Sequence, residues 1–305
     1  MYGYYLELLG YKNLPEYLKK YLNVPSLERL KDVGYFCGMD YASKDIYNFK
    51  EKISRFDHSL SVCLLTFKLT KDYNASLAGL FHDISTPCFS HVIDYMNSDY
   101  YNQESTEFYT GKVVQEDNVL TSLLKKDNIS LNDVINFKKY TVLDNDRPKL
   151  CADRLDGIIL SSISWTNKIN ESIIKNIIDD IDVFVNEDNE KEIGFNTRKT
   201  SEIVNELSDI FNKYCHSNED NYMMELLAKI AKYLIDKNYI TYDDLYIYNE
   251  KQLFELMPSL NDEYLNNLLN KFKTIKKEEI TYCDIPEIKN RYINPLIKNK
   301  RLIMN

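Results

Sequence analysis

The sequence has 305 residues, with 38 Lys and Arg against 47 Asp and Glu, and 44% of its residues are hydrophobic. This length and apolar share allow a sizeable core, in two domains or in one large domain with an appendage. A net charge of −9 argues against broad binding to nucleic-acid backbones, which requires a basic surface. Neither glycine-rich phosphate loop, GxGxxG or GxxxxGK[ST], occurs, so the folds that depend on them are excluded.

Helical periodicity dominates the chain, and the expected fold class is mainly α. A polar turn, NEDNE, between two β-rich segments predicts one small β-hairpin over residues 181–185 and 191–195. The N-terminal helices are expected at residues 14–33 (two short ones), 54–70, 74–83, 87–96, 104–115, 117–126 and 146–162. After the hairpin, helices are expected at residues 198–215, 220–237, 241–248, 250–257 and 262–273.

Cysteine spacing and hydropathy bear on the compartment. The six cysteines form no CxxC pair, which makes a zinc knuckle unfavourable. The first residues lack a basic start followed by an apolar run, and no segment reaches the ~18 apolar residues of a membrane span. We therefore expect reduced thiols, a cytoplasmic protein and no association with a membrane.

Three of the four histidines fall within residues 58–91, and one of them is followed directly by an acid, His82-Asp83. Adjacent residues on a helix point about 100° apart, but at a helix end both side chains can converge on an ion beyond that end. His58 on a neighbouring helix and a carboxylate further along would complete a cage. Two imidazoles with two carboxylates suit a borderline or hard divalent cation.

Three motifs make this pattern more specific. They are SRFDHS at residues 54–59, HDISTPCFSH at residues 82–91 and DRLD at residues 153–156. With them the chain resembles the HD superfamily of metal-dependent phosphohydrolases, and is most similar to the branch of deoxynucleoside triphosphate triphosphohydrolases. The resemblance covers roughly residues 25–165 and implies an HD-domain helical core, here with the small hairpin and a helical C-terminal extension.

The resemblance also implies roles for individual residues. It assigns the metal ligands His58, His82, Asp83 and Asp153, and the phosphate contacts Arg55 and Arg154. Lys149, one turn before Asp153, is a weaker candidate for contact with phosphate. Asp156 is expected either to contact substrate or to orient a ligand, with a salt bridge as the third reading.

The catalytic residues are less well determined by the sequence. His91 and Glu104 are the candidates for proton transfer to the leaving group. Two catalytic histidines of the triphosphohydrolase branch correspond to Thr86 and to the stretch from Asn102, and its motif tyrosine corresponds to Gly157. These departures predict slow triphosphohydrolase activity and leave metal-dependent hydrolysis of a phosphoester as the more general function.

The predicted function is therefore a metal-dependent hydrolase of a nucleotide or other small phosphoester, in which metal-activated water attacks phosphorus. The alternative is a metal-binding HD domain with little turnover that senses a nucleotide or binds a partner. Other HD chemistries, such as a cyclic-nucleotide phosphodiesterase or a di-iron oxygenase, remain as a third class. The expected cofactor is a divalent ion, with Mn, Mg, Fe, Co, Ni and Zn as candidates.

The domain organisation and the partners complete these expectations. Residues 1–197 are expected to form the HD-type phosphohydrolase core, with its motifs within residues 54–161, and residues 198–305 a helical C-terminal region. The expected partner is a small phosphorylated substrate, with a nucleotide favoured. Family relatives form symmetric oligomers, so the resemblance also suggests a homo-oligomer.

Overall fold

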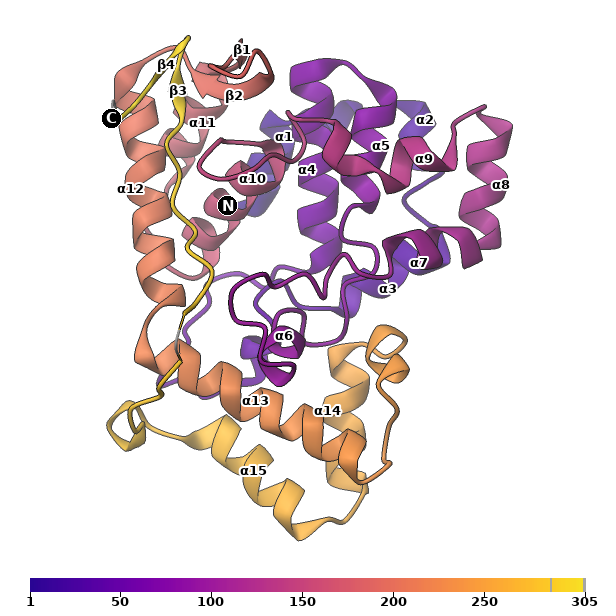
Figure 1. Ribbon diagram of the computed structural model, residues 1–305, viewed down its shortest axis with the longest axis vertical. Helices are drawn as coiled ribbons and strands as arrows, with labels where there is room; N and C mark the ends of the chain where they lie inside the picture. The colour runs from indigo at the N-terminus through magenta and orange to yellow at the C-terminus, as the bar shows by residue number, and fades with distance from the viewer. Residues whose placement is uncertain (286, 304–305) are drawn as a thin grey trace.

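The computed structural model describes residues 1–285 and 287–303, and it is mainly α-helical, as predicted (Figure 1). The helices before the hairpin are α1 (Tyr2–Leu8), α2 (Glu16–Lys19), α3 (Pro25–Arg29), α4 (Arg55–Thr70), α5 (Tyr73–Phe81), α6 (Val92–Met96), α7 (Thr110–Glu116), α8 (Asn118–Lys126), α9 (Leu131–Ile135), α10 (Ala152–Ser164) and α11 (Glu171–Asp180). Those after it are α12 (Arg198–Cys215), α13 (Asn218–Asp236), α14 (Glu250–Ser259) and α15 (Glu263–Thr274). Short 3₁₀ turns are η1 (Tyr11–Asn13), η2 (Leu30–Asp32), η3 (Met39–Tyr41), η4 (Phe137–Lys139), η5 (Asp243–Tyr246) and η6 (Lys277–Glu279).

Helix α4 is the central element of the N-terminal half. It packs against both α5 and α10, and every side chain from His58 to Thr66 is buried. A helix that is buried on all sides needs neighbours on each face, and α5 and α10 supply them. A capping box fixes the first turn of α4: Ser54 and Asp57 exchange hydrogen bonds with each other's backbone N–H groups.

The predicted hairpin is present with the expected boundaries, as β1 (Ile181–Val185) and β2 (Lys191–Phe195). Two short strands from the C-terminal tail, β3 (Leu296–Ile297) and β4 (Lys300–Arg301), extend it to a sheet ordered β1-β2-β3-β4. Strand β3 pairs parallel to β2, with Leu296 opposite Gly194. A Cβ atom on Gly194 would lie 2.8 Å from the Leu296 side chain, so glycine permits this close approach. Strands β3 and β4 have two residues each, too few to show the alternating pattern from which a strand is predicted.

The helix predicted from Thr86-Pro87 begins later, at Val92. Phe89 and Ser90 have φ angles of 68° and 48°, a left-handed backbone that interrupts a right-handed helix. Thr86 does not cap this helix, because its hydroxyl donates to the carbonyl of Asp83. The prediction was wrong because residues 88–91 form turns before the helix begins.

The helix predicted from residue 146 also begins later, at Ala152. Three backbone N–H groups that would belong to its first turns are bonded elsewhere. Leu150 N–H donates to the Glu192 carboxylate, and the N–H groups of Ala152 and Asp153 donate to carbonyls of residues 142 and 143. The segment before α10 is therefore a loop whose donors are used by the hairpin and by the preceding turn.

The C-terminal helices pack against the N-terminal half rather than apart from it. Helix α12 contacts α10, and α13 contacts α6 and α15. The tail after η6 then runs back alongside α12 to the sheet (Figure 1). Among the described residues, no helix combines the length and apolar character needed to cross a bilayer.

Candidate metal centre

Three helix ends bring the candidate ligands together. His58 lies in the first turn of α4, which the Ser54 cap starts. His82 and Asp83 follow the last residue of α5, and Asp153 lies in the first turn of α10. His82 and Asp83 thus lie at the end of α5, as the sequence predicted, and α4 and α10 each contribute one residue from their first turns.

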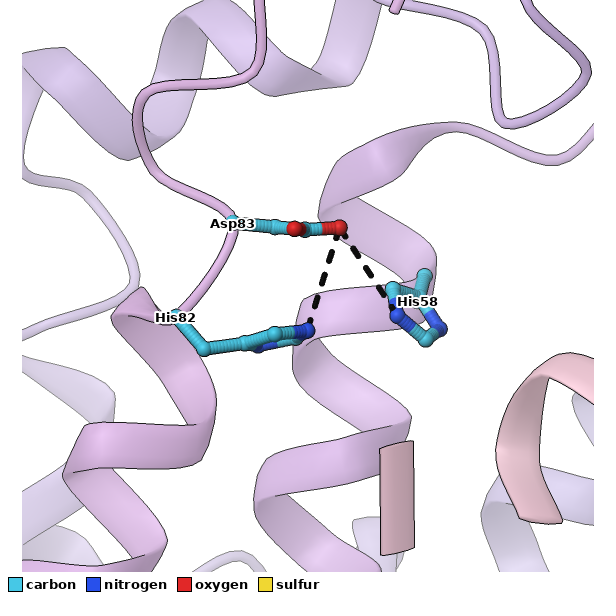
Figure 2. A group of neighbouring side chains, drawn as sticks. All are labelled: His58, His82 and Asp83. Atoms are coloured by element: carbon cyan, nitrogen blue, oxygen red, sulfur yellow. Dashed lines mark ion pairs between the residues drawn. The ribbon is translucent and has the colours of Figure 1, made fainter. Parts of the chain in front are cut away.

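The four side chains meet in a small volume. One ligand atom each from His58, His82 and Asp83 lies within 4.8 Å of the others. Nε2 of each histidine is 3.8 Å from Oδ2 of Asp83, as Figure 2 shows. Asp153 Oδ1 lies 3.0 Å from His58 Nε2 and 3.5 Å from His82 Nε2. We refer to His58, His82, Asp83 and Asp153 as the HD group.

Each imidazole is held in one orientation by a hydrogen bond at its Nδ1 atom. His82 donates through Nδ1 to the carbonyl of Gly79 at 2.8 Å, and His58 Nδ1 lies 2.7 Å from Oδ2 of Asp156. The Nε2 atoms therefore face the carboxylates of the HD group. Nε2 of His82 is buried without a hydrogen-bond partner among the described residues. A buried, unsatisfied imidazole nitrogen beside two carboxylates fits a divalent ion, because metal-binding histidines are held in this way through their other nitrogen.

The charges of the HD group also fit a bound cation. Burial alone lowers the pKa of His82, but Asp83 and Asp153 outweigh burial and raise this pKa to about 10. Burial raises the pKa of Asp153, yet the two histidines lower it well below its ordinary value. The two acids thus remain charged and offer negative ligands for a cation.

Asp156 binds His58 and does not line the pocket. The side chain is fully buried, with one carboxylate oxygen at His58 Nδ1 and the other accepting from the Tyr5 hydroxyl at 2.7 Å. With both oxygens occupied by protein groups, the reading of Asp156 as a substrate contact is not supported. The alternative reading, that Asp156 orients a metal ligand, matches this geometry.

Arg55 is buried beside the HD group. Its Nη1 donates to Asp83 Oδ2 at 2.9 Å, and its guanidinium lies 4.9 Å from the centre of the Tyr35 ring. Its Nε has no hydrogen-bond partner among the described residues. The guanidinium thus both stabilises the Asp83 charge and keeps a free donor at the wall of the pocket.

A pocket of about 570 Å³ opens over the HD group. It is lined by all four members of the HD group and by four further residues predicted from the sequence: Arg55, His91, Glu104 and Arg154. Lys149 is not part of this lining. It forms ion pairs at 2.7 Å with Asp188 and 2.8 Å with Glu190 of the hairpin turn, so a role in phosphate contact is not supported.

The proton-transfer candidates differ in their surroundings. His91 Nδ1 lies 2.9 Å from Oδ2 of Asp94, and burial lowers the pKa of the imidazole. Glu104 is exposed at the pocket rim. Glu107, which the sequence did not single out, also lines the pocket, and burial raises its pKa even though Lys138 pairs with it at 2.8 Å.

Tyr35 is a second pocket residue that sequence reasoning missed. Its hydroxyl lies 2.8 Å from where a Cβ atom of Gly157 would stand. Gly157 occupies the position of the motif tyrosine, and a larger side chain there would collide with the Tyr35 hydroxyl. A tyrosine from a distant segment thus fills the space that the missing side chain leaves, and no local motif could have indicated it.

Comparisons with known proteins agree with this site. Residues 55–186, which contain the whole HD group, match the model of the HD domain family. The chain is 25% identical to the "Uncharacterized protein YdhJ" of Bacillus subtilis over 294 residues, covering 95% of this chain and 86% of the relative. It is also 27% identical to the "Metal-dependent phosphohydrolase cns2" of Cordyceps militaris over 114 residues, covering 37% of this chain and 32% of the relative. The helical core, the His-Asp group and the family match agree, and they show that this chain carries an HD domain over residues 55–186.

Proposed function

We propose that this protein is a metal-dependent hydrolase of a nucleotide or another small phosphoester. The observation that carries the proposal is the meeting of two imidazoles and two carboxylates at the floor of one pocket, with arginines in its wall. The similarity to a protein named as a metal-dependent phosphohydrolase supports the same reaction class.

The HD group would hold the divalent ion through His58, His82, Asp83 and Asp153. Such an ion lowers the pKa of a bound water and polarises a phosphoryl oxygen. Arg55 and Arg154 each keep a buried Nε without a partner among the described residues, and both line the pocket. Asp83 holds Arg55, and the carbonyls of Lys149 and Asn145 hold Arg154, so both guanidinium charges stay at the pocket. These positive charges suit the negative charge that develops on phosphoryl oxygens during in-line attack.

Proton transfer would be divided between two side chains. Because burial lowers the pKa of His91, its ring is chiefly neutral at pH 7, and Asp94 holds its Nδ1. Nε2 is then a proton acceptor, so His91 suits the role of base or of acceptor for a substrate hydroxyl. Glu107, with its raised pKa, is better suited than the exposed Glu104 to protonate the leaving group.

The test is a substrate screen of the purified chain with Mg²⁺, Mn²⁺, Fe²⁺ and Co²⁺ in parallel. Nucleoside mono-, di- and triphosphates, cyclic nucleotides and sugar phosphates would be offered, with phosphate, pyrophosphate or triphosphate identified among the products. We expect turnover of at least one class that is lost on chelation and in the Asp83→Ala variant. Bound metal without turnover on any class would contradict the proposal and favour a sensor role.

A further inference from the structure

The C-terminal tail crosses the rim of the pocket before it joins the sheet. We call residues 287–294 the strap. Its backbone is fastened at both ends: Lys289 N–H donates to the carbonyl of Tyr100, and Asn294 N–H donates to the carbonyl of Pro148. Between them, Arg291 N–H donates to Asn212 Oδ1 at 2.7 Å. Figure 1 shows this tail running beside α12.

The strap and the loop before α10 bring three cations to one pocket. Lys289 and Arg291 line it from the strap, and Arg147 lines it from the loop. Lys289 Nζ donates to the backbone carbonyl of Asn102, and Arg291 Nη2 donates to the amide oxygen of Gln103. Within the described residues, none of the three cations forms an ion pair with a carboxylate.

The unused donors of this cluster are buried. Nη1 of Arg147 and Nε of Arg291 have no hydrogen-bond partner within residues 1–285 and 287–303. Buried donors without partners are costly, and each guanidinium offers several N–H groups in a fork that matches phosphate oxygens. The side chains are thus arranged for an acceptor that the protein itself does not supply.

Charge repulsion within the cluster agrees with this arrangement. Burial, with repulsion from Arg154 and Arg291, lowers the pKa of Arg147 to about 9. Burial, with repulsion from Arg291 and Arg147, lowers the pKa of Lys289 to about 8.

Four acids act on the cluster from a distance, and each is engaged by another group: Asp153 acts on Arg147 and binds His58, Asp220 is influenced by Arg291 and accepts from the Tyr47 hydroxyl, and Glu107 and Asp94 are the other two. Glu107 and Asp94 act on Lys289 from a distance. Glu107 forms its ion pair with Lys138, and Asp94 binds His91 and the backbone N–H of Ser105. Neither carboxylate therefore neutralises the three cations.

We propose that Arg147, Lys289 and Arg291 form an anion subsite for a phosphoryl group other than the one at the HD group. The substrate would then carry at least two phosphoryl groups, a class that the pocket volume of about 570 Å³ can accommodate. A phosphoryl group carries up to two negative charges on three oxygens, so it matches three cations better than a single carboxylate, which carries one charge on two oxygens. The substrate class inferred here rests on the proposed hydrolase function. The binding of a phosphoryl anion by the three cations does not depend on that function.

The test is calorimetric titration of the full chain with inorganic tripolyphosphate and with orthophosphate, in chelator so that no metal binds either probe. We expect tripolyphosphate to bind at least tenfold more tightly than orthophosphate. Lys289→Met and Arg291→Gln should each weaken tripolyphosphate binding roughly tenfold, and 0.5 M salt should weaken binding to the wild type. Lys300→Met is the matched control, because Lys300 is exposed on β4 of the same tail and does not line the pocket.

Two further variants separate charge from folding and from the hydrolase proposal. Arg291→Lys keeps the charge but not the guanidinium fork, so it should bind tripolyphosphate more weakly than the wild type and more tightly than Arg291→Gln. If the two variants lose the same affinity, the charge of Arg291 contributes nothing and the subsite is overturned. Equal affinities for Lys289→Met, Arg291→Gln and Lys300→Met would also overturn it. Asp83→Ala should abolish turnover yet keep the tripolyphosphate affinity, so failure of the hydrolase proposal and failure of the subsite give different results.

Discussion

Asp156 influences the metal centre through His58, one contact away from the pocket. Its carboxylate lies 2.7 Å from His58 Nδ1 and also accepts the Tyr5 hydroxyl, so it fixes the ring with Nε2 facing the other ligands. Arg55 acts comparably on Asp83, which it holds by a 2.9 Å hydrogen bond. At this scale the site consists of candidate ligands and of the residues that keep those side chains in one orientation.

Replacing Asp156 by Asn should weaken metal binding by about 10- to 100-fold, the usual effect of losing a carboxylate that orients a histidine ligand. The shape of the side chain is kept, so the melting temperature should change less than in an alanine variant. A competition titration with a metal-binding dye measures the affinity. An unchanged metal affinity with a raised KM would instead indicate that Asp156 contacts substrate.

Replacing Asp83 by Ala should remove bound metal while helicity is largely kept, because Asp83 follows the end of α5. It should also destabilise the fold by about 3 kcal/mol, since Arg55 is left as a buried charge without its carboxylate. Elemental analysis and urea unfolding measure the two effects. Asp179→Ala, which breaks an exposed pair with Lys175, is the control and should change neither. Stoichiometric metal in Asp83→Ala would contradict its assignment as a ligand.

At the scale of elements, the sequence predicted best where the signal was local. Helical periodicity located α4, the polar NEDNE turn between two β-rich segments located the hairpin, and the HD dipeptide indicated a metal site at the end of α5. The sequence failed where distant partners decide the backbone. Leu150 N–H binds Glu192, 42 residues away, and this contact replaces the first turn of the helix expected from residue 146.

The candidate functional residues likewise divide into those in local motifs, which the sequence predicted, and those brought in by distant segments, which it did not. His58, His82, Asp83 and Asp153 stand in short motifs at helix ends, so their types and spacing were informative. Tyr35, Glu107 and the cations of the strap reach the pocket through contacts between distant segments, and Arg291 meets Gln103 across 188 residues. No spacing pattern encodes such a contact.

Helix α14 carries a buried acid that should make stability depend on pH. Glu250, in the first turn of α14, is 1% exposed. Its carboxylate and that of Asp40 both lie beside Gly34. Glu250 Oε1 and Asp40 Oδ2 have no hydrogen-bond partner among the described residues. Burial, with repulsion from Asp40, raises the pKa of Glu250 to about 8. The folded state thus favours the protonated acid, and its contribution to stability, full below pH ~4.5, is lost as the pH rises through 8.

Glu250→Gln should remove this dependence, because the amide stays neutral at every pH. We expect the variant to melt close to the wild type at pH 5 and roughly 5 °C above it at pH 9. Thermal melts across this range provide the measurement. A variant that melts below the wild type at pH 9 would show that the ionised carboxylate has a favourable partner.

For the whole molecule, the tail connects the sheet to the loop that carries Asp153. Arg301 Nη1 and Nη2 donate to the two carboxylate oxygens of Glu192 at 2.6 and 2.9 Å, and Glu192 is fully buried. Glu192 in turn accepts from Leu150 N–H, three residues before Asp153. The end of the tail therefore supports the position of a candidate metal ligand.

Replacing Arg301 by Ala should lower the free energy of unfolding by about 3 kcal/mol, because it leaves a buried carboxylate without its cation. Urea unfolding followed by circular dichroism provides the value. Arg198→Ala is the matched control, since Arg198 pairs with Glu202 on the exposed face of α12 and should cost less than about 1 kcal/mol. Equal losses in the two variants would mean that the Glu192 pair adds nothing beyond a surface contact.

The strap also has a consequence for the order in which the chain is made and folded. All four residues of the HD group have been made once residue 153 has emerged from the ribosome, whereas Lys289 and Arg291 of the strap follow much later. Closing contacts across 188 residues costs more chain entropy than closing the 95 residues between His58 and Asp153. Because Glu192 and Arg301 also support the loop that carries Asp153, a nascent chain should reach its full affinity for metal, like its affinity for a polyphosphorylated ligand, only after the tail has been made.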